Sequence, residues 1–206
     1  SKEELEGLKN VLLKHERVIV IADEIYEHIN YVGKHASIAS FPDLKERVVV
    51  INGVSKAYAM TGWRIGFIAA PEWIVKGCNK LQGQYTSGPC SVSQKAAEAA
   101  FAGDQQCVED MRQAFERRKN LIVKLAKDIP GLEVNEPQGA FYLFPKCLED
   151  DDYAFCERAK KYNLLLVPAD SFGTPGYVRI AYCVSHEKIL KSMDGFQKLA
   201  AEYGLS

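Results

Sequence analysis

The sequence predicts an α/β sheet domain followed by a smaller α+β domain. In the first half, short runs rich in valine and isoleucine alternate with helical segments, which is typical of a parallel sheet covered on both faces. Beyond Pro130-Gly131 the apolar runs become shorter and no longer alternate regularly with helices. We therefore expect two domains, at residues 1–113 and 114–206.

The first domain is expected to begin with a helix, because Ser1 and Glu4 have the spacing of a capping box. The apolar face of this helix consists of Leu5, Leu8 and Leu12. Three strand-sized apolar runs follow, at Val18–Ala22, Val48–Ile51 and Phe67–Ala70. A further helix is expected from Ser91 to Phe101.

A long amphipathic helix is expected after Gly103-Asp104, with an apolar face formed by Val108, Met111, Phe115, Ile122 and Leu125. The second domain then contains three short strands, around Tyr142–Phe144, Leu164–Val167 and Tyr177–Ala181. Between the first two strands, a helix is expected from about Tyr153 to Lys161. The last helix ends at Gly204, and its apolar face consists of Ile189, Met193, Phe196, Ala200 and Tyr203.

The composition argues against some classes of function. The chain has 26 basic and 27 acidic residues, a net charge of −1, so it lacks the electrostatic footprint of a protein that binds nucleic acid or anionic membranes. Its apolar runs are strand-sized, and we find no secretory or transit signal. We therefore expect a soluble cytoplasmic protein whose ligands are small metabolites.

The cysteines and histidines do not predict a metal site. The six cysteines lie far apart without paired spacing, so we expect reduced and mostly buried thiols. His186-Glu187 lacks a second histidine four residues on, where Leu190 stands, and this excludes the common zinc helix. Gly53-x-Ser55 resembles a nucleophile elbow, but the closing position is Ala57, so a hydrolase is a poor second interpretation.

Polar side chains follow two of the apolar runs. Asp23-Glu24-Ile25-Tyr26 comes after the run from Arg17 to Ala22, and the segment GVSKAYAMTGWRIG, residues 53–66, places Lys56 and Arg64 after the next run. Neighbouring strand ends would thus offer a carboxylate, a phenol, an amine and a guanidinium. This set suits a lysine that forms a Schiff base with an aldehyde cofactor carrying a basic ring nitrogen, a phenolate oxygen and a phosphate.

These two segments resemble those of the class I and II aminotransferases, which use pyridoxal phosphate. The likeness is greatest to the bacterial aspartate aminotransferases and extends over essentially all 206 residues. Residues 53–66 are its specific part, since Asp-Glu-x-Tyr alone is a weak signal. The resemblance implies part of the large sheet domain of aminotransferase fold type I, followed by the small C-terminal domain.

The resemblance also implies roles for individual residues. Lys56 is the Schiff-base lysine, Asp23 pairs with the pyridine nitrogen and Tyr26 bonds the phenolate oxygen. Arg64 and Ser55 bind the phosphate. The implied cofactor-binding residues are therefore Asp23, Tyr26, Ser55, Lys56 and Arg64. Many members of the family carry a hydroxyl residue where this chain has Gly53, so a backbone N–H is expected to serve in its place.

A second arginine is expected to bind substrate. In the segment 176–182, Val178 and Ile180 face one side of a strand and Arg179 faces the other. In the resembling family this position is the arginine that grips the α-carboxylate of the substrate, which implies the same role for Arg179. The preceding segment, 167–173, is also similar to the family, although Ala169 stands where a glycine is usual.

The function implied by the resemblance is amino transfer between an L-amino acid, most directly aspartate, and a 2-oxo acid, most directly 2-oxoglutarate. The route would be ping-pong through pyridoxamine phosphate. Alternatives on the same fold are an aromatic or broad-specificity aminotransferase and a carbon–sulfur lyase. A non-catalytic effector domain of an aminotransferase-like transcription regulator is a further alternative, which would require a basic winged-helix domain upstream.

Members of the resembling family are about twice as long as this chain. We therefore expect an incomplete C-terminal half, which would lack the glycine-rich phosphate loop, the aromatic ring that stacks on the cofactor, the Asn-Pro-x-Gly segment and the substrate lid. Such a fragment is expected to be inactive alone. The full-length protein is expected to form a homodimer. Residues 82–89 resemble a loop that lies near the dimer interface in the family.

Overall fold

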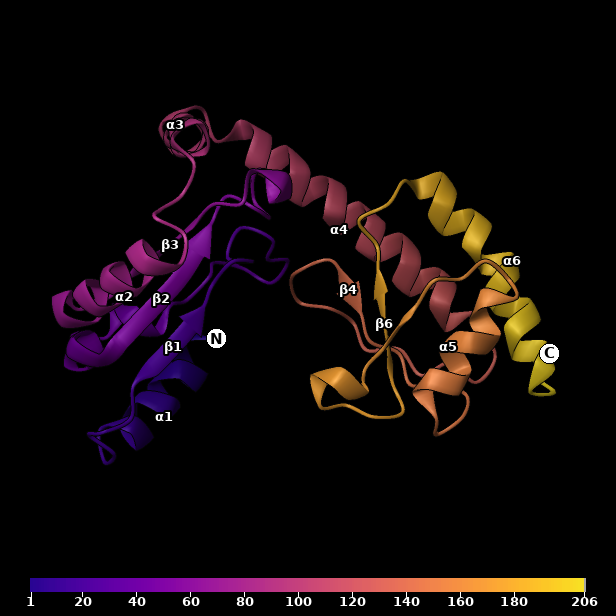
Figure 1. The fold of residues 1–206 in the computed structure, drawn as a ribbon. Coiled ribbons are helices and arrows are strands. Elements are labelled where there is room, and N and C mark those ends of the chain that lie inside the picture. Colours follow the sequence, from indigo (N-terminus) through magenta and orange to yellow (C-terminus); the bar gives the residue numbers. More distant parts are fainter. Residues whose placement is uncertain (206) are drawn as a thin grey trace. The chain divides into compact units, whose positions relative to one another are not determined.

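The computed structural model describes residues 1–205 and divides into two compact units, the first comprising Ser1–Met111 and the second beginning at Arg112. The division falls inside helix α4 (Gln106–Lys127), which begins in unit 1 and ends in unit 2 (Figure 1). The domain boundary expected from the sequence, after residue 113, lies two residues further along the same helix.

Unit 1 is built on a three-stranded sheet. Helix α1 (Lys2–Leu12) precedes strands β1 (Val20–Asp23), β2 (Val48–Gly53) and β3 (Gly66–Ala69), and the sheet order is β1-β2-β3. The predicted capping box of α1 is present, with the Ser1 hydroxyl accepting from the Glu4 N–H. All three predicted strands form, with ends that differ by one or two residues from the expected ranges.

The direction of β3 departs from the prediction of a parallel sheet. β1 and β2 are parallel, but β3 runs antiparallel to β2, with Gly66 opposite Gly53. A parallel strand requires a crossover connection, usually a helix, that returns the chain to the other end of the sheet. Residues 54–65 contain only a short 3₁₀ turn (η3, Thr61–Trp63), so the chain re-enters the sheet at the end where it left.

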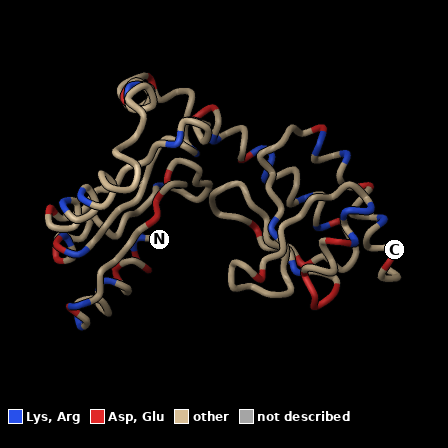
Figure 2. Tube along the Cα trace, viewed as in Figure 1, with Lys and Arg blue, Asp and Glu red and all other residues tan. Residues whose placement is uncertain are grey.

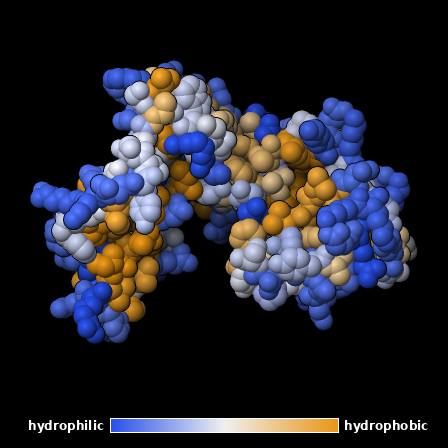
Figure 3. Space-filling model, viewed as in Figure 1, coloured by the Kyte–Doolittle hydropathy of each residue, from blue (hydrophilic) through white to orange (hydrophobic). Residues whose placement is uncertain are grey.

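One face of the sheet carries the core of unit 1. Leu12 of α1 packs there with a cluster completed by Ile38, Phe41, Leu44 and Val48. On the opposite face, Val49 is buried but Ile21 is 67% exposed and Ile51 is 37% exposed, so this chain covers that face only in part. Figure 3 shows apolar side chains reaching the surface over β1 and α1.

Two helices follow the sheet. The sequence analysis does not predict α2 (Glu72–Tyr85), which contains Gly77 and Gly83, lacks a side-chain N-cap and has no buried residue. Two glycines lower the helix propensity of this segment, but Ile74, Cys78, Leu81 and Tyr85 recur at helical spacing and could have indicated the helix. The segment 82–89, expected to be a loop, begins with the last turn of α2. Helix α3 (Ser91–Ala102) forms where it is predicted.

Unit 2 consists of the rest of α4, a small sheet and two further helices. Strands β4 (Tyr142–Leu143), β5 (Val167–Pro168) and β6 (Val178–Ala181) are antiparallel in the order β4-β6-β5. The helices are α5 (Asp152–Lys160) and α6 (His186–Glu202). The buried residues of α6 are Ile189, Met193, Gly195, Phe196, Leu199 and Ala200, close to the predicted apolar face.

The strand predicted at Leu164–Val167 begins only at Val167. The N–H of Leu164 donates to the carbonyl of Ala159 at 3.1 Å, and Asn163 has a positive φ of 58°. These are the features of a helix C-terminal cap, so residues 163 and 164 form the turn that caps α5 and are not part of the strand.

The charges are mixed over both units. Figure 2 shows acidic and basic residues interspersed along the chain, in keeping with the net charge of −1. Among the described residues, no helix is both long enough and apolar enough to cross a bilayer.

The cysteines are less buried than the sequence suggests. Cys147 and Cys156 are buried, whereas the other four, Cys78, Cys90, Cys107 and Cys183, are exposed; all six are free thiols. Burial raises the pKa of Cys147 to about 12 and that of Cys156 to about 11. Cys90 stands at the start of α3, where hydrogen bonds from the backbone of Ser93 and Val92 lower its thiol pKa.

Glycine is required where β2 meets β3. A Cβ added to Gly53 would lie 2.9 Å from Gly66 Cα and 3.0 Å from the carbonyl oxygen of Ile65. Both are backbone atoms, which cannot rotate away, so the paired strands would have to separate.

We expect Gly53→Ala to lower the free energy of unfolding by about 1–3 kcal/mol, the usual cost of forcing an extra carbon into a packed site. Gly7→Ala is the matched control, because a Cβ on Gly7 in α1 meets nothing within 4 Å. It should raise stability by roughly 0.5–1 kcal/mol. Urea denaturation compares the two, and a Gly53→Ala midpoint at or above that of the unmodified chain would contradict the close approach.

The rate at which each of the six thiols reacts should follow its exposure and its thiolate fraction, because the thiolate is the nucleophile. Near pH 7, iodoacetamide should modify Cys90 first. Cys147 and Cys156 stay protonated until the pH approaches their raised pKa values, so they should react only after unfolding. Peptide mass spectrometry over a time course measures the order, and early labelling of either buried thiol would contradict it.

Candidate functional site

Two strand ends meet at one edge of the unit 1 sheet. β1 and β2 are parallel neighbours, with Asp23 opposite Ile51, so their carboxyl ends lie together. The N–H of Glu24 donates to the carbonyl of Ile51 at 2.9 Å and extends this pairing by one residue. The Asp-Glu-x-Tyr turn and the lysine segment therefore begin side by side.

Three of the predicted cofactor residues line a single pocket. Asp23, Ser55 and Arg64 are part of the wall of an open cavity of about 310 Å³, which also contains Ile25, Ile51, Asn52, Ile65 and Gly66. The carboxylate comes from the end of β1, the hydroxyl from the turn after β2, and the guanidinium from the turn before β3. Acceptor and donor groups for a polar ligand thus converge from three segments.

Lys56 and Tyr26 are not in the wall of this pocket, but they lie next to each other. The amine nitrogen of Lys56 is 5.5 Å from the centroid of the Tyr26 ring, a distance at which an ammonium is attracted by the ring face. Both residues are half-buried. The structure therefore places the predicted lysine and phenol together on the turns that also carry Ser55 and Asp23.

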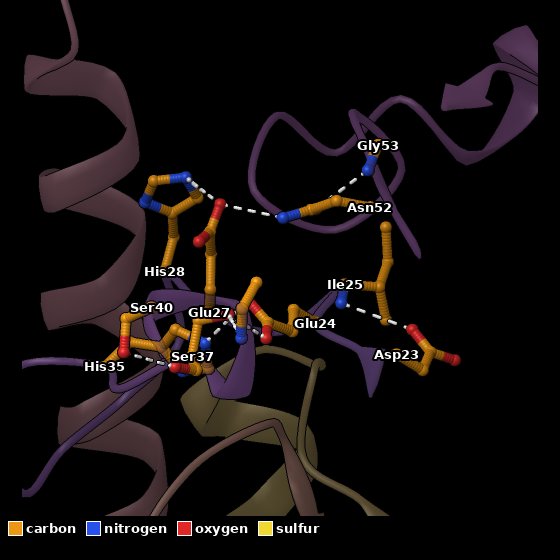
Figure 4. Close-up of polar contacts among 11 residues, drawn as sticks. Asp23, Glu24, Ile25, Glu27, His28, His35, Ser37, Ser40, Asn52 and Gly53 are labelled. Carbon is orange, nitrogen blue, oxygen red and sulfur yellow. Dashed lines mark hydrogen bonds and ion pairs between the residues drawn. The ribbon is translucent and has the colours of Figure 1, made fainter. Parts of the chain in front are cut away.

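The carboxylate of Asp23 is oriented by its own turn. Its Oδ1 accepts a hydrogen bond from the N–H of Ile25 at 3.3 Å (Figure 4). This side-chain bond to the backbone two residues on is an Asx turn, which fixes the direction of a short acidic side chain. Asp23 is exposed, so its carboxylate is accessible to a ligand.

The segment between Lys56 and Gly66 contains backbone strain. Ala59 and Arg64 both have φ of 52°, in the left-handed region that residues with a Cβ rarely adopt. Each such residue costs on the order of 1 kcal/mol and persists only where its surroundings hold it. One guanidinium nitrogen of Arg64 donates to the carbonyl of Thr61 at 2.9 Å, which holds the side chain against the turn.

Tyr58 ties this segment to the residue that precedes α4. Its hydroxyl donates to Oε1 of Gln105 at 2.6 Å, just before α4. Burial, with a smaller contribution from the charge of Cys107, raises the pKa of Tyr58. The phenol therefore stays protonated and holds the chain two residues after Lys56.

The backbone N–H expected to replace a hydroxyl at Gly53 is already engaged. Gly53 N–H donates to Oδ1 of Asn52 at 2.7 Å. A hydroxyl side chain there would meet the backbone of Gly66, as described above. The structure thus explains why glycine occupies this position; the expectation that a backbone N–H serves in place of the hydroxyl stays a prediction.

Acidic, histidine and amide side chains near these turns form polar contacts with one another (Figure 4). The Glu24 carboxylate accepts from the Ser37 hydroxyl at 2.5 Å and pairs with Nε2 of His35 at 3.1 Å. Glu27 accepts from Nδ2 of Asn52 at 2.8 Å. One ligand atom each of Glu24, Glu27 and His35 lies within 4.8 Å of the others. With these partners, the carboxylates serve an internal hydrogen-bond network; the prediction of no metal site stays a prediction.

Arg179 belongs to unit 2, on β6. Its guanidinium carbon lies 4.6 Å from the ring centroid of Tyr142 and 4.5 Å from that of Phe172. Val178 is fully buried, whereas Arg179 and Ile180 are both half-buried. Two aromatic contacts hold the flat guanidinium while its N–H groups remain suited to a planar anion.

Sequence reasoning missed Asn52 and the role of Glu27. Asn52 is 8% exposed, one of few buried polar residues in the described part of the chain. A signal was present, since an amide inside an otherwise apolar strand must find partners when buried. Its partner, 25 positions earlier, could not be identified from spacing alone.

Comparisons with known proteins identify the family. A family model described as aminotransferase class I and II matches residues 1–195. The chain therefore belongs to the class I and II aminotransferases, a family that depends on pyridoxal phosphate.

Individual relatives agree with this assignment. The chain is similar to the aspartate aminotransferase of Geobacillus stearothermophilus, with 46% identity over 195 residues, which are 90% of this chain and 49% of that protein. The solved aspartate aminotransferase of Rhizobium meliloti matches with a TM-score of 0.93 at 34% identity, over 100% of this chain and 55% of its own. The aromatic aminotransferase of Pyrococcus horikoshii also reaches 0.93, at 37% identity, over 99% of this chain and 56% of its own.

These likenesses confirm the predicted fold class, that of the fold type I aminotransferases. The chain spans about half the length of the relatives that it matches.

Proposed function

We propose that this protein transfers an amino group between an L-amino acid and a 2-oxo acid, with pyridoxal phosphate as its cofactor. The observation that carries the proposal is the meeting of Asp23, Ser55 and Arg64 in one pocket, beside the paired Lys56 and Tyr26. Membership of the aminotransferase family supports the same activity.

The residues present fit this cofactor. When bound, pyridoxal phosphate supplies a conjugated ring that absorbs the electrons left behind as a substrate loses its Cα proton. It presents a basic ring nitrogen, a phenolate oxygen, an aldehyde and a phosphate. The site offers a carboxylate, a phenol, an amine, and a guanidinium with a hydroxyl, which match these four groups one by one.

Each side chain then has a distinct task. Asp23, whose direction is set by its Asx turn, would pair with the ring nitrogen and keep it protonated. The hydroxyl of Tyr26 would donate to the phenolate oxygen. Arg64 and Ser55 would bind the phosphate, because a planar guanidinium donates two parallel hydrogen bonds to phosphate oxygens.

Lys56 would perform two tasks. Its Nζ would hold the cofactor covalently between turnovers. Once the amino group of the substrate has replaced it, the same Nζ would act as a base that accepts the Cα proton and delivers it to the former aldehyde carbon of the cofactor, two bonds away. The neighbouring ring of Tyr26, 5.5 Å from Nζ, would orient this amine.

Arg179 would bind the α-carboxylate common to all amino acid substrates. A bidentate pair fixes both the position and the orientation of the carboxylate. This orients the Cα–H bond without reading the side chain of the substrate.

We infer aspartate and 2-oxoglutarate as the substrates; the names of the Geobacillus and Rhizobium relatives support aspartate as the amino donor. Aromatic amino acids are the second candidates, because the Pyrococcus relative is named an aromatic aminotransferase.

We further infer the organisation of the complete protein. Residues 1–113 would be part of the large cofactor-binding domain and residues 114–206 the small domain, which is supported by the division of the structure near Met111. The full-length protein would be a cytoplasmic homodimer. Its ligands would be amino acids and 2-oxo acids, with neither nucleic acid nor membrane as a partner.

The first test of this function is covalent attachment of pyridoxal phosphate, which requires no turnover. The chain is incubated with the cofactor, reduced with borohydride and digested, and the labelled peptide is identified by mass spectrometry. The label should fall on Lys56, because neighbouring groups would hold the phosphate and the ring there. Lys95, on α3 with a side chain 79% exposed, is the internal control for random reaction. Preferential labelling of another lysine would contradict the assignment of Lys56 as the Schiff-base lysine.

The second test concerns Arg179. In protein that carries out the transfer, Arg179→Ala should lower kcat/KM by a similar factor for every amino acid, by about 3 kcal/mol or on the order of 100-fold. Arg158→Ala is the matched control, since Arg158 pairs with Glu149 at 3.0 Å instead. A changed preference among side chains with little overall loss would show that Arg179 determines specificity.

A further inference from the structure

The turn after β1 and the turn after β2 are joined by one chain of hydrogen bonds. Nδ2 of Asn52 donates to Oε1 of Glu27 at 2.8 Å, and Oδ1 of Asn52 accepts from the N–H of Gly53 at 2.7 Å. Figure 4 shows the amide of Asn52 between these two partners. The chain therefore runs from Glu27, next to Tyr26, to Gly53, three residues before Lys56.

The orientation of this amide is determined by chemistry. One partner, the Glu27 carboxylate, can only accept hydrogen bonds, and the other, the Gly53 N–H, can only donate. If the amide were reversed, oxygen would face oxygen and N–H would face N–H. Because Asn52 is 8% exposed, water cannot readily replace a lost partner, so both bonds must form together.

We propose that Asn52 and Glu27 are positioning residues that hold the Tyr26 turn and the Lys56 turn in register. The inference rests on the proposed function, in which these two turns supply the phenol and the amine. Glu27 is one residue after Tyr26, and its carboxylate also contacts Nε2 of His28 at 3.2 Å. Neither Asn52 nor Glu27 has to touch a reacting atom for this role.

The test reverses donor and acceptor in the hydrogen bond between residues 52 and 27. Asn52→Asp keeps the acceptor for Gly53 but places an oxygen against Glu27, so the link between the turns breaks. Glu27→Gln keeps an acceptor for Asn52, so the link remains. The double variant restores the link in reverse, because a glutamine at 27 can donate to an aspartate at 52. It also has the same net charge as the unmodified protein, which separates charge from positioning.

Two rates are measured for Lys56 in the full chain. The first is the rate of acetylation by acetic anhydride relative to Lys95, which requires no cofactor. The second is the rate of borohydride-trapped attachment of pyridoxal phosphate. In Asn52→Asp we expect the relative acetylation to rise about threefold or more as the turn loosens. We expect attachment to fall by about tenfold as the site loses its geometry.

Glu27→Gln and the double variant should both stay within about twofold of the unmodified protein in both rates, at similar thermal midpoints. Unchanged Lys56 rates in Asn52→Asp, or no recovery in the double variant, would overturn the proposal. A parallel rise at Lys95 would also overturn it, because it would indicate general loosening. If Asn52→Asp does not fold, Glu27→Ala removes the same acceptor at a partly exposed position and must reproduce both changes.

The two readouts separate this proposal from the proposed function. If the unmodified chain shows no preferential cofactor label on Lys56, the cofactor role fails. The acetylation ratio still decides whether the Asn52–Glu27 bond positions the lysine.

Discussion

The parallel pairing of β1 with β2 is the constraint on which the candidate site depends. Parallel neighbours end at the same edge of a sheet, so segments 25 or more residues apart in sequence become adjacent turns. The return of β3 in the opposite direction then brings Arg64 back to that edge. The end of β1, the turn after β2 and the turn before β3 therefore all contribute side chains to one pocket at the same edge of the sheet.

Close backbone contact and strain maintain this arrangement. Gly53 and Gly66 let β2 and β3 approach until no side chain fits between them. The loop that joins these strands holds Ala59 and Arg64 in left-handed conformations. A hydrogen bond from Tyr58 to Gln105 ties this loop to the residue that precedes α4, and a bond from Arg64 to Thr61 braces the loop internally. These contacts help to hold the strained segment that follows Lys56.

The sequence predicted most elements and the groups at the strand ends because those features are local. Apolar runs, a capping box and the order of residues 53–66 can all be read over a few positions. It did not predict the antiparallel β3 or the partly exposed sheet face, which depend on how the loop closes and on what lies beside the sheet. It also missed α2, although Ile74, Cys78, Leu81 and Tyr85 have helical spacing, and the bond between Asn52 and Glu27, which links positions that only the fold brings together.

The contacts of Arg179 with Tyr142 and Phe172 have a thermodynamic consequence. A free arginine side chain loses about 2 kcal/mol of rotamer entropy when a ligand fixes it. Here the rings restrict the side chain while the protein folds, so much of that loss occurs before any anion arrives. Capture of a carboxylate by Arg179 should accordingly show a small entropic penalty. Either ring could then tune anion affinity without contacting the anion.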